Sequence, residues 1–340
     1  MSALAVLWFF LIFVLIAGYF VLDGFDLGAG VLYRVLAKDE TERALVRRSI
    51  GPVWDGNEVW LLTAGGALFA AFPAAYATTF SGFYLAVMLV LFGLIVRAVS
   101  LEFRAHDPHW ARVWDACFTV GSVLPALLLG VALANVIAGI PMAENGDYAG
   151  VPLLGLLSPF TLVVGLLGFA MCLSAGAAWV ALKTPERSAV RQRACRQRSV
   201  WQAAAVVLFA LATVLALAVV KPELAAGMNV LAVVFAIAFV ACVAASFVLG
   251  RKGADLPAFL LQSAAAVCLV ALAAVSLFPN LVVASPESVG ASITLMSAAS
   301  SDLSLAWMTG IACVGVPLVL VYHVIVYRTF AGRLTEKDVA

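Results

Sequence analysis

Charged residues are scarce in this sequence, and their scarcity argues against a soluble protein. Only 11% of the 340 residues are Asp, Glu, Lys or Arg, whereas a soluble globular domain contains about 25%. Apolar residues make up 64% of the chain, so too few polar side chains remain to cover a surface in water. The excess apolar surface must face lipid, and we predict an integral membrane protein.

The sequence lacks the features that are typical of several other classes of protein. The net charge of +1 gives no electrostatic reason to expect nucleic-acid binding. The six cysteines form no Cys-x-x-Cys pair and are nearly all in separate predicted helices, so we expect no disulfide framework and no metal site. The sequence also contains no G-x-x-x-x-G-K-[ST] motif, which argues against an ATPase.

Histidine is scarce as well. His106 and His109 lie in a predicted cytoplasmic loop, and only His323 falls in a predicted membrane helix. A low-spin haem is clamped by two axial ligands, and two histidines on facing helices are not available here. Single ligation by His323 is an alternative, but an ordinary histidine near the membrane interface is favoured. We therefore expect that this chain itself binds no haem.

Stretches without charge predict the transmembrane helices, each of which needs about 20 residues. The stretches are 1–22, 59–96, 116–143, 148–182, 199–220, 224–250, 256–286 and 303–327. As one helix, the stretch 59–96 would be about 57 Å long, nearly two bilayer cores. Pro73 divides it, so we place a tight turn there and predict nine transmembrane helices.

The distribution of lysine and arginine predicts the orientation. Of the 20 basic residues, 19 fall in alternate loops and the carboxyl-terminal tail, and only Lys221 falls on the other side. The positive-inside rule places these basic loops in the cytoplasm. We therefore predict a periplasmic amino terminus, a cytoplasmic carboxyl terminus and a first helix that is retained rather than cleaved as a signal peptide.

Ionisable residues inside the membrane are the main functional signal, because a charge there is costly unless it is paired or neutralised. The predicted first helix carries Asp23 and Asp26, and the second carries Asp55 and Glu58; each spacing of three places both acids on one helix face. Further charged residues of the same four helices are Arg97, Glu102, Arg104 and Asp115. We expect them all at the cytoplasmic ends of these helices, with nothing comparable in helices five to nine.

Two interpretations of these acids stay open, and they do not exclude each other. In the first, Arg97 neutralises Asp26 or a buried Asp55, and the residues form a static ion-pair network. In the second, the acids form a proton-conducting chain that opens to the cytoplasm. Asp115 alone is also explained as an acid near a helix amino terminus, favoured by the helix dipole.

Residues for close helix packing surround the acids. Gly24 and Gly28 form a Gly-x-x-x-Gly pair on either side of Asp26 and allow a neighbouring helix to approach. Asn57 can hydrogen-bond between helices. Trp60 is typical of an anchor at the membrane interface, and a role in lining a path for a small molecule is the alternative.

Five segments carry a resemblance to a known family. They are Asp23-Gly24-Phe25-Asp26-Leu27-Gly28, Trp54-Asp55-Gly56-Asn57-Glu58-Val59-Trp60-Leu61, Thr63-Ala64-Gly65-Gly66-Ala67-Leu68-Phe69-Ala70, Phe80-Ser81-Gly82-Phe83-Tyr84 and Gly332-Arg333-Leu334-Thr335. With Arg97, they resemble subunit II of the cytochrome bd quinol oxidases. The motifs are specific in the first hundred residues, and beyond about 150 the similarity is one of hydropathy. The loop between the sixth and seventh predicted helices, 221–226, is short, and in this respect the chain resembles the compact, cyanide-insensitive branch of the family.

The resemblance implies a fold and a function. It implies two four-helix bundles and a peripheral helix, which we assign to residues 1–138, 148–279 and 303–340. It implies a haem-free subunit of a terminal oxidase that oxidises quinol and reduces oxygen to water, with haem b and haem d on subunit I. Asp55, Glu102 and His106 match positions of a proton path from the cytoplasm, and Trp60 matches a position on an oxygen route. Glu58 departs from relatives that have glutamine there.

The resemblance also implies partners and a location. The partners are subunit I, a small single-span accessory subunit, quinol and lipid, with no nucleic acid, and some relatives hold a structural quinone. The location is the bacterial inner membrane. Two other functions stay as alternatives: a proton-coupled secondary transporter, disfavoured because no broken helix pairs occur in matching halves, and a purely structural scaffold.

Overall fold

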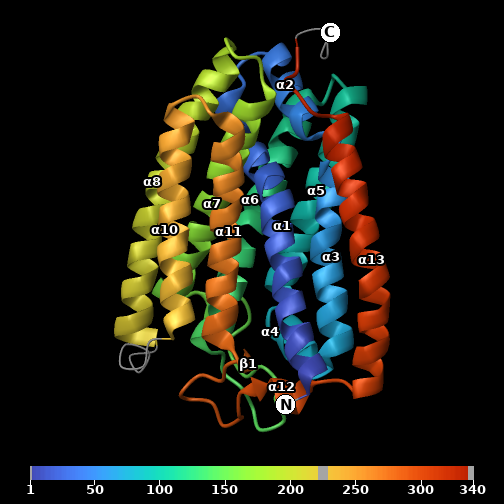
Figure 1. Ribbon diagram of the computed structural model, residues 1–340, viewed down its shortest axis with the longest axis vertical. Coiled ribbons are helices and arrows are strands. Elements are labelled where there is room, and N and C mark those ends of the chain that lie inside the picture. Colours follow the sequence, from blue (N-terminus) through green and yellow to red (C-terminus); the bar gives the residue numbers. More distant parts are fainter. Residues whose placement is uncertain (1, 221–228, 336–340) are drawn as a thin grey trace.

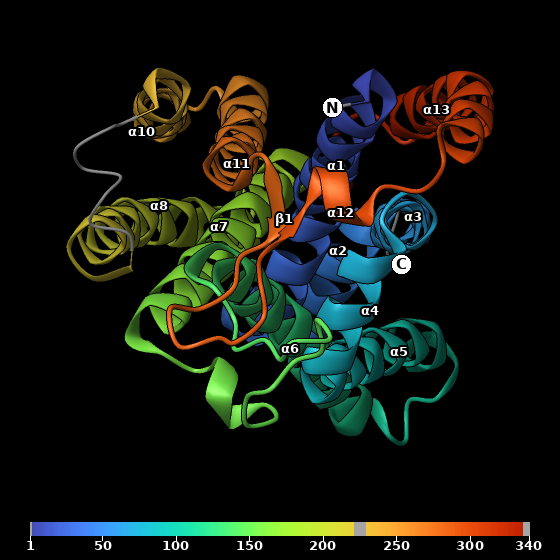
Figure 2. The ribbon, with the colours of Figure 1, turned by 90° about the horizontal axis from the view of Figure 1, so that it is seen from below.

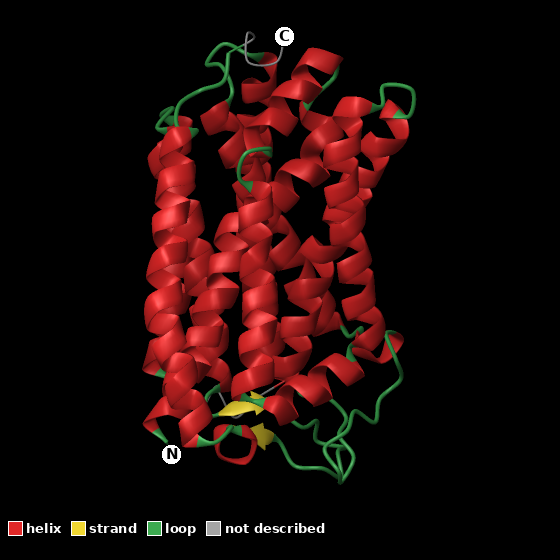
Figure 3. Ribbon diagram, turned by 90° about the vertical axis from the view of Figure 1, so that its right-hand side faces the viewer, coloured by secondary structure: helices red, strands yellow, loops and turns green. Residues whose placement is uncertain are grey.

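The structure, a computed structural model, describes residues 2–220 and 229–335. Long helices run side by side along the long axis of the molecule, and two short strands lie at the end that holds the amino terminus (Figures 1 and 3). The described carboxyl-terminal residues lie at the opposite end, beside the short helix α2 (Glu40–Ile50) (Figure 1). The molecule is therefore a helical bundle of the all-α class, as the sequence predicts.

The remaining elements share this axis or connect its ends. They are α1 (Ala3–Leu36), α3 (Trp54–Ala71), α4 (Pro73–Gly82), α5 (Tyr84–His106), α6 (Ala111–Ala138), α7 (Pro159–Lys183), α8 (Ala189–Leu215), α10 (Val230–Arg251), α11 (Asp255–Leu277), β1 (Asn280–Val282), β2 (Ile293–Thr294), α12 (Leu295–Ala298) and α13 (Asp302–Thr329). The strands pair antiparallel.

Eight helices in the described part of the chain are long and apolar enough to cross a membrane. They are α1, α5, α6, α7, α8 with its π-helical continuation to Val220, α10, α11 and α13. The ninth expected span corresponds to α3, which has 18 residues but carries Asp55, Asn57 and Glu58 in its first turns. These polar residues lower its hydropathy, so the count of nine spans stays a prediction, as does the orientation.

The predicted break at Pro73 is present, but the single helix expected after it is wrong. α3 ends at Ala71 and α4 begins at Pro73, where proline is favoured because the first residue of a helix needs no hydrogen-bonded N–H. α4 is short, and a second helix, α5, begins at Tyr84. Viewed along the axis, α4 lies between α3 and α5 (Figure 2), so two helices replace the one predicted.

Charge is a poor guide to the ends of the helices. α1 continues 14 residues past Leu22 because Asp23 and Asp26 are buried within it among polar partners. α8 begins at Ala189 and α7 ends at Lys183, so about two thirds of the basic segment 183–198 is helical rather than loop. In contrast, α11 ends at Leu277 although the sequence stays uncharged to residue 286.

The amphipathic helix α2 was not predicted, because its basic residues were assigned to a cytoplasmic loop. The Asp39 side chain caps this helix by accepting a hydrogen bond from the Glu42 N–H at 2.9 Å. Leu45, Val46 and Ile50 on one face are buried in the core. The basic side chains on the other faces therefore remain free to pair with acids, as shown below.

α7 is the central helix, and small residues let α1 pack closely against it. Viewed along the axis, α1, α6 and α8 surround α7, whereas α13 lies at the periphery (Figure 2). A Cβ atom added at Gly28 would lie 1.8 Å from the backbone oxygen of Cys172. The Gly24 and Gly28 pair thus faces α7, in the second half of the chain. The division into bundles 1–138 and 148–279 with a third segment 303–340 stays a prediction.

We predict different tolerance at the two glycines of this pair. Gly28→Ala should destabilise the protein by about 1–3 kcal/mol or more, because the new methyl group meets backbone that cannot rotate away. Gly24→Ala is the matched control: its Cβ would lie 3.7 Å from the Cys172 sulfur, an ordinary contact. Thermal unfolding of the purified complex measures the difference, and equal midpoints for the two variants would contradict the assignment.

Candidate functional site

A fully buried arginine joins three helices within the first hundred residues. Arg97 of α5 has no exposed surface, and its Nη2 lies 2.5 Å from Asp23 Oδ1 of α1 and 2.7 Å from Glu58 Oε1 of α3. The Asp23 side chain is also fully buried, whereas 20% of the Glu58 side chain is exposed. The expected ion network therefore forms, but its acids are Asp23 and Glu58 rather than Asp26 or Asp55.

Asp26 has different neighbours. This fully buried carboxyl accepts a hydrogen bond of 2.7 Å from the Asn57 amide through Oδ2. The Asn57 side-chain oxygen in turn accepts a bond of 3.0 Å from the hydroxyl of Tyr327 on α13. Asn57 thus bridges helices, as predicted, and it connects α13 to the interior.

Several polar atoms beside these groups have no partner. Asp26 Oδ1 and the Arg97 atoms Nε and Nη1 are buried without a hydrogen-bond partner among the described residues. Within the same part of the chain, Asp26 forms no ion pair within 4.0 Å. Buried polar atoms in proteins usually bind water when side chains do not satisfy them. The unpartnered atoms of Asp26 and Arg97 are therefore groups that can bind water between Asp26 and Glu58.

Asp55, Glu102 and His106 do not belong to the buried cluster. All three are exposed in the chain by itself, so the expectation of a buried Asp55 paired with Arg97 is wrong for this chain. Asp55 is the second residue of α3 and its side chain is exposed, whereas Arg97 is fully buried and pairs with Asp23 and Glu58. The described contact of the His106 ring is to the backbone oxygen of Glu102 at 3.0 Å.

Asp115 is the centre of a second cluster, at the end of the molecule that carries α2. Asp115 Oδ1 accepts hydrogen bonds from Arg104 Nε at 2.9 Å and from the Tyr33 hydroxyl at 3.1 Å. Arg43 Nη1 lies 3.2 Å from its other oxygen. Arg104 also pairs with Glu40 of α2 at 2.6 Å. Direct ion pairs therefore explain the buried Asp115 better than a helix dipole does.

Glu40 is held ionised by its neighbours. Burial raises the pKa of the Glu40 carboxyl, but the hydrogen bond from Arg47 and the charges of Arg47 and Arg104 outweigh it, so the pKa is below its ordinary value. Arg47 lies 2.9 Å from Glu40 and also donates to the Tyr33 hydroxyl. These bonds fix α2 to the ends of α1, α5 and α6, and the sequence pattern of α2 gave no signal for them.

His323 has hydrogen-bond partners at both ring nitrogens. Its Nδ1 lies 2.8 Å from the backbone oxygen of Val319, and its Nε2 accepts a hydrogen bond of 3.2 Å from the Trp60 indole N–H. The indole also packs on α1, because a Cβ at Gly18 would lie 2.2 Å from the Trp60 ring. These bonds fit a neutral histidine with no free nitrogen for a haem iron.

The second half of the chain contains a buried ion cluster that the sequence argument excluded. Asp255 is 3% exposed. It pairs with Arg191 at 2.7 Å, with Arg333 at 3.1 Å and with Arg198 at 3.2 Å. Arg198 is itself buried at the start of an apolar stretch. The prediction that helices five to nine contain no comparable charged cluster is therefore wrong. The available signal in the sequence was that Asp255 and Arg198 each directly precede a long uncharged stretch.

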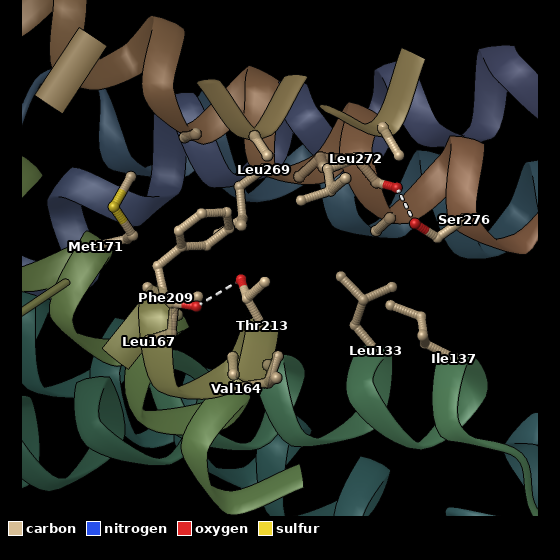
Figure 4. Close-up of a pocket in the computed structure, with 18 of the residues that line it drawn as sticks. Leu133, Ile137, Val164, Leu167, Met171, Phe209, Thr213, Leu269, Leu272 and Ser276 are labelled. Atoms are coloured by element: carbon tan, nitrogen blue, oxygen red, sulfur yellow. Dashed lines mark hydrogen bonds between the residues drawn. The ribbon is translucent and has the colours of Figure 1, made fainter. Parts of the chain in front are cut away.

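A polar network and a cavity also lie in this half. Gln202 donates to Ser246 at 2.8 Å and to Gln262 at 3.1 Å, and Gln262 donates to Ser174 at 2.6 Å. Beside it, α1, α6, α7, α8, α10 and α11 line a partly open cavity of about 490 Å³. Its labelled lining includes Leu133, Leu167, Phe209 and Leu269, with the Thr213 and Ser276 hydroxyls bonded to backbone (Figure 4). An apolar molecule fits this lining.

These features define a class of protein. No group of three or more His, Cys, Asp and Glu side chains that could hold a metal occurs in residues 2–220 and 229–335. The described part is instead a multi-pass helical membrane protein, with two acids and an arginine buried together in its first helices. Buried ionisable groups of this kind mark proton or ion pathways, or ion pairs that hold helices together.

The comparisons with known proteins show the family. The model of cytochrome bd terminal oxidase subunit II matches residues 4–330. The chain is 35% identical, over an alignment 371 positions long, to cytochrome bd-I ubiquinol oxidase subunit 2 of Escherichia coli, covering 99% of this chain and 97% of the relative. It is 33% identical over 341 residues to cytochrome bd ubiquinol oxidase subunit 2 of Bacillus subtilis, covering 99% of both chains.

A solved structure agrees in fold. The bd oxidase from Geobacillus thermodenitrificans matches with a TM-score of 0.73 over 97% of this chain and 99% of that chain, at 18% identity. The chain belongs to the cytochrome bd terminal oxidase subunit II family. It is a subunit of a bd-type quinol oxidase, an oxidoreductase complex of the bacterial inner membrane. The resemblance is confirmed, so the transporter alternative is set aside, and whether the acids conduct protons or are purely structural stays a prediction.

One segment named above, 221–226, lies outside the described residues. The short segment 221–226, which resembles the cyanide-insensitive branch, falls within residues 221–228. Assignment to that branch therefore stays a prediction.

We predict that Arg97 is required for assembly. Arg97→Gln should cost about 3–5 kcal/mol, because it leaves Asp23 buried without a cation. The double variant Arg97→Gln with Asp23→Asn removes both charges and should recover part of this loss. Arg196→Gln, at an exposed arginine, is the control and should change little. Thermal unfolding and complex yield measure these effects; a stable single variant would contradict the pairing.

Proposed function

We propose that this chain is the haem-free subunit of its oxidase and that it delivers protons from the cytoplasm toward the partner subunit that carries haem b and haem d. The observation that carries the proposal is Asp26, a buried carboxyl whose described partner is a neutral amide rather than a cation. A carboxyl at membrane depth without a counter-ion is costly when ionised, so it is suited to take up and release a proton.

The path we propose begins at the exposed Asp55. Asp55 and Glu58 lie three residues apart on α3, so a proton can pass between neighbouring side chains or through one water. The Glu58 side chain is 20% exposed and touches Arg97, which also contacts Asp23. The unpartnered atoms of Arg97 and Asp26 supply sites for water between Glu58 and Asp26. Glu102 and His106 extend the surface at which protons are collected.

Arg97 and Asp23 have a different role in this proposal. Both are fully buried and lie 2.5 Å apart, so each neutralises the other and holds α1 against α5. The static network and the proton path are therefore adjacent parts of one site. Arg97 sets the local charge, and Asp26 and Glu58 carry the proton.

Other proposed roles rest on single features. Trp60, half-buried between α1 and α13, is proposed to lie on an oxygen route. The cavity of about 490 Å³ is proposed to hold the apolar part of a quinone. Subunit I and a small single-span accessory subunit are proposed to cover exposed apolar faces such as that of α13, of which Leu305 is the one fully buried residue among those described.

We predict that the path variants slow turnover without loss of assembly. Asp55→Asn and Asp26→Asn keep the shape of the side chain but cannot carry a proton, so oxygen consumption should fall about tenfold or more at an unchanged haem-to-protein ratio. Glu287→Gln, an exposed acid at the opposite end, should keep full activity. Full activity of both path variants would refute the path.

We predict that His323→Ala leaves the haem content unchanged. Both nitrogens of His323 are occupied by Trp60 and the Val319 carbonyl, so the ring is not poised to ligate iron. The visible spectrum of the complex, purified through a tag on this chain, gives haem per protein. Loss of one haem equivalent while the partner subunit is retained would show that this chain contributes a ligand.

A further inference from the structure

A second cavity lies at the end of the molecule that carries α2 and the described carboxyl-terminal residues. Its volume is about 190 Å³, and it lies between the turn that joins α2 to α3, the end of α7 and the chain after α13. Three cationic side chains line it, Arg48, Lys183 and Arg333, and no acid is among its described lining residues. The cavity is therefore positively charged.

Lys183 is a buried cation without an acid. The residue is 8% exposed. Its ammonium donates to the backbone oxygen of Phe330 and lies 5.4 Å from the centroid of the Trp179 ring. In residues 2–220 and 229–335 it has no carboxylate within 4.0 Å. Burial of an ammonium is costly unless an anion compensates it.

The nearby acids do not supply that anion. Arg333 pairs with Asp255 at 3.1 Å and with the exposed Glu186 at 3.8 Å, so both acids already have a cation. Arg333 also donates to the backbone oxygens of Ala181 at 3.1 Å and Thr184 at 2.9 Å. These bonds fix the chain after α13 as a wall of the cavity. Asp255 is already paired with Arg191 and Arg198 as well. Arg48, exposed at the rim, forms no ion pair within the described part of the chain.

We propose that this cavity binds a phosphate-bearing anion, with Lys183 and Arg48 as its charged ligands. The volume equals that of about six water molecules, which admits a phosphate group but not a whole lipid. Lys183 is the last residue of the membrane helix α7, so the cavity lies at the depth of phospholipid headgroups. The phosphate can come from an anionic phospholipid or from inorganic phosphate in solution.

The test uses the intact oxidase complex, stripped of loosely held lipid in detergent. Thermal unfolding is followed during titration with inorganic phosphate, at constant ionic strength, and with a short-chain phosphatidylglycerol; the diacylglycerol with the same chains is the control probe. We expect at least one phosphate probe, but not the diacylglycerol, to stabilise the complex. Which of the two acts identifies the source of the phosphate.

The variants decide whether the cavity is the site. Lys183→Gln and Arg48→Gln should each raise the probe concentration that gives half of the full stabilisation about fivefold. Lys252→Gln, at an exposed lysine in the α10–α11 turn, should leave this concentration unchanged. If the Lys183 variant does not assemble, the Arg48 variant decides alone. The proposal is overturned if neither phosphate probe stabilises the complex, or if the variants bind as the unmodified complex does.

Discussion

The pairing of Arg97 with Asp23 and Glu58 is the interaction on which the first helices depend. A guanidinium without exposed surface is tolerated inside a membrane protein only when acids neutralise it. Because its two acids come from α1 and α3, while Arg97 belongs to α5, the pairing fixes the relative depth of three helices at once. It also creates the charged surroundings in which Asp26 lies, one turn further along α1 from Asp23.

This arrangement explains how one site can be both rigid and chemically active. Asp23 is fully buried beside Arg97, which holds it ionised, whereas Asp26 is bonded to a neutral amide and has no cation to hold it ionised. Glu58 also pairs with Arg97, but its side chain is 20% exposed and can exchange a proton with water. Asp23 and Asp26 are three residues apart on one helix and differ in whether a cation holds them ionised. The difference in partners, not in residue type, separates the structural acid from the proposed proton carrier.

The second half of the chain uses the same principle at a different depth. Asp255 pairs with three arginines, one of which, Arg333, comes from the chain after α13. Together with the bond from Lys183 to the Phe330 carbonyl, this ties the end of the peripheral helix to α7 and α11. More positive charge than negative is collected here, and the surplus at Lys183 and Arg48 is what makes the second cavity a candidate anion site.

The sequence by itself determined the class of membrane protein and most of the helices, because a helix that faces lipid needs a long apolar segment. It also determined the family, because a motif such as Asp23 to Gly28 is formed by consecutive residues. It also identified Arg97, Asp26, Asn57 and Glu58 as residues of one site. Only the tertiary structure decided which acid pairs with which arginine, that Asp55 is exposed on this chain, and that Asp255 is buried. Such pairings depend on contacts between helices far apart in sequence, which charge counting does not contain.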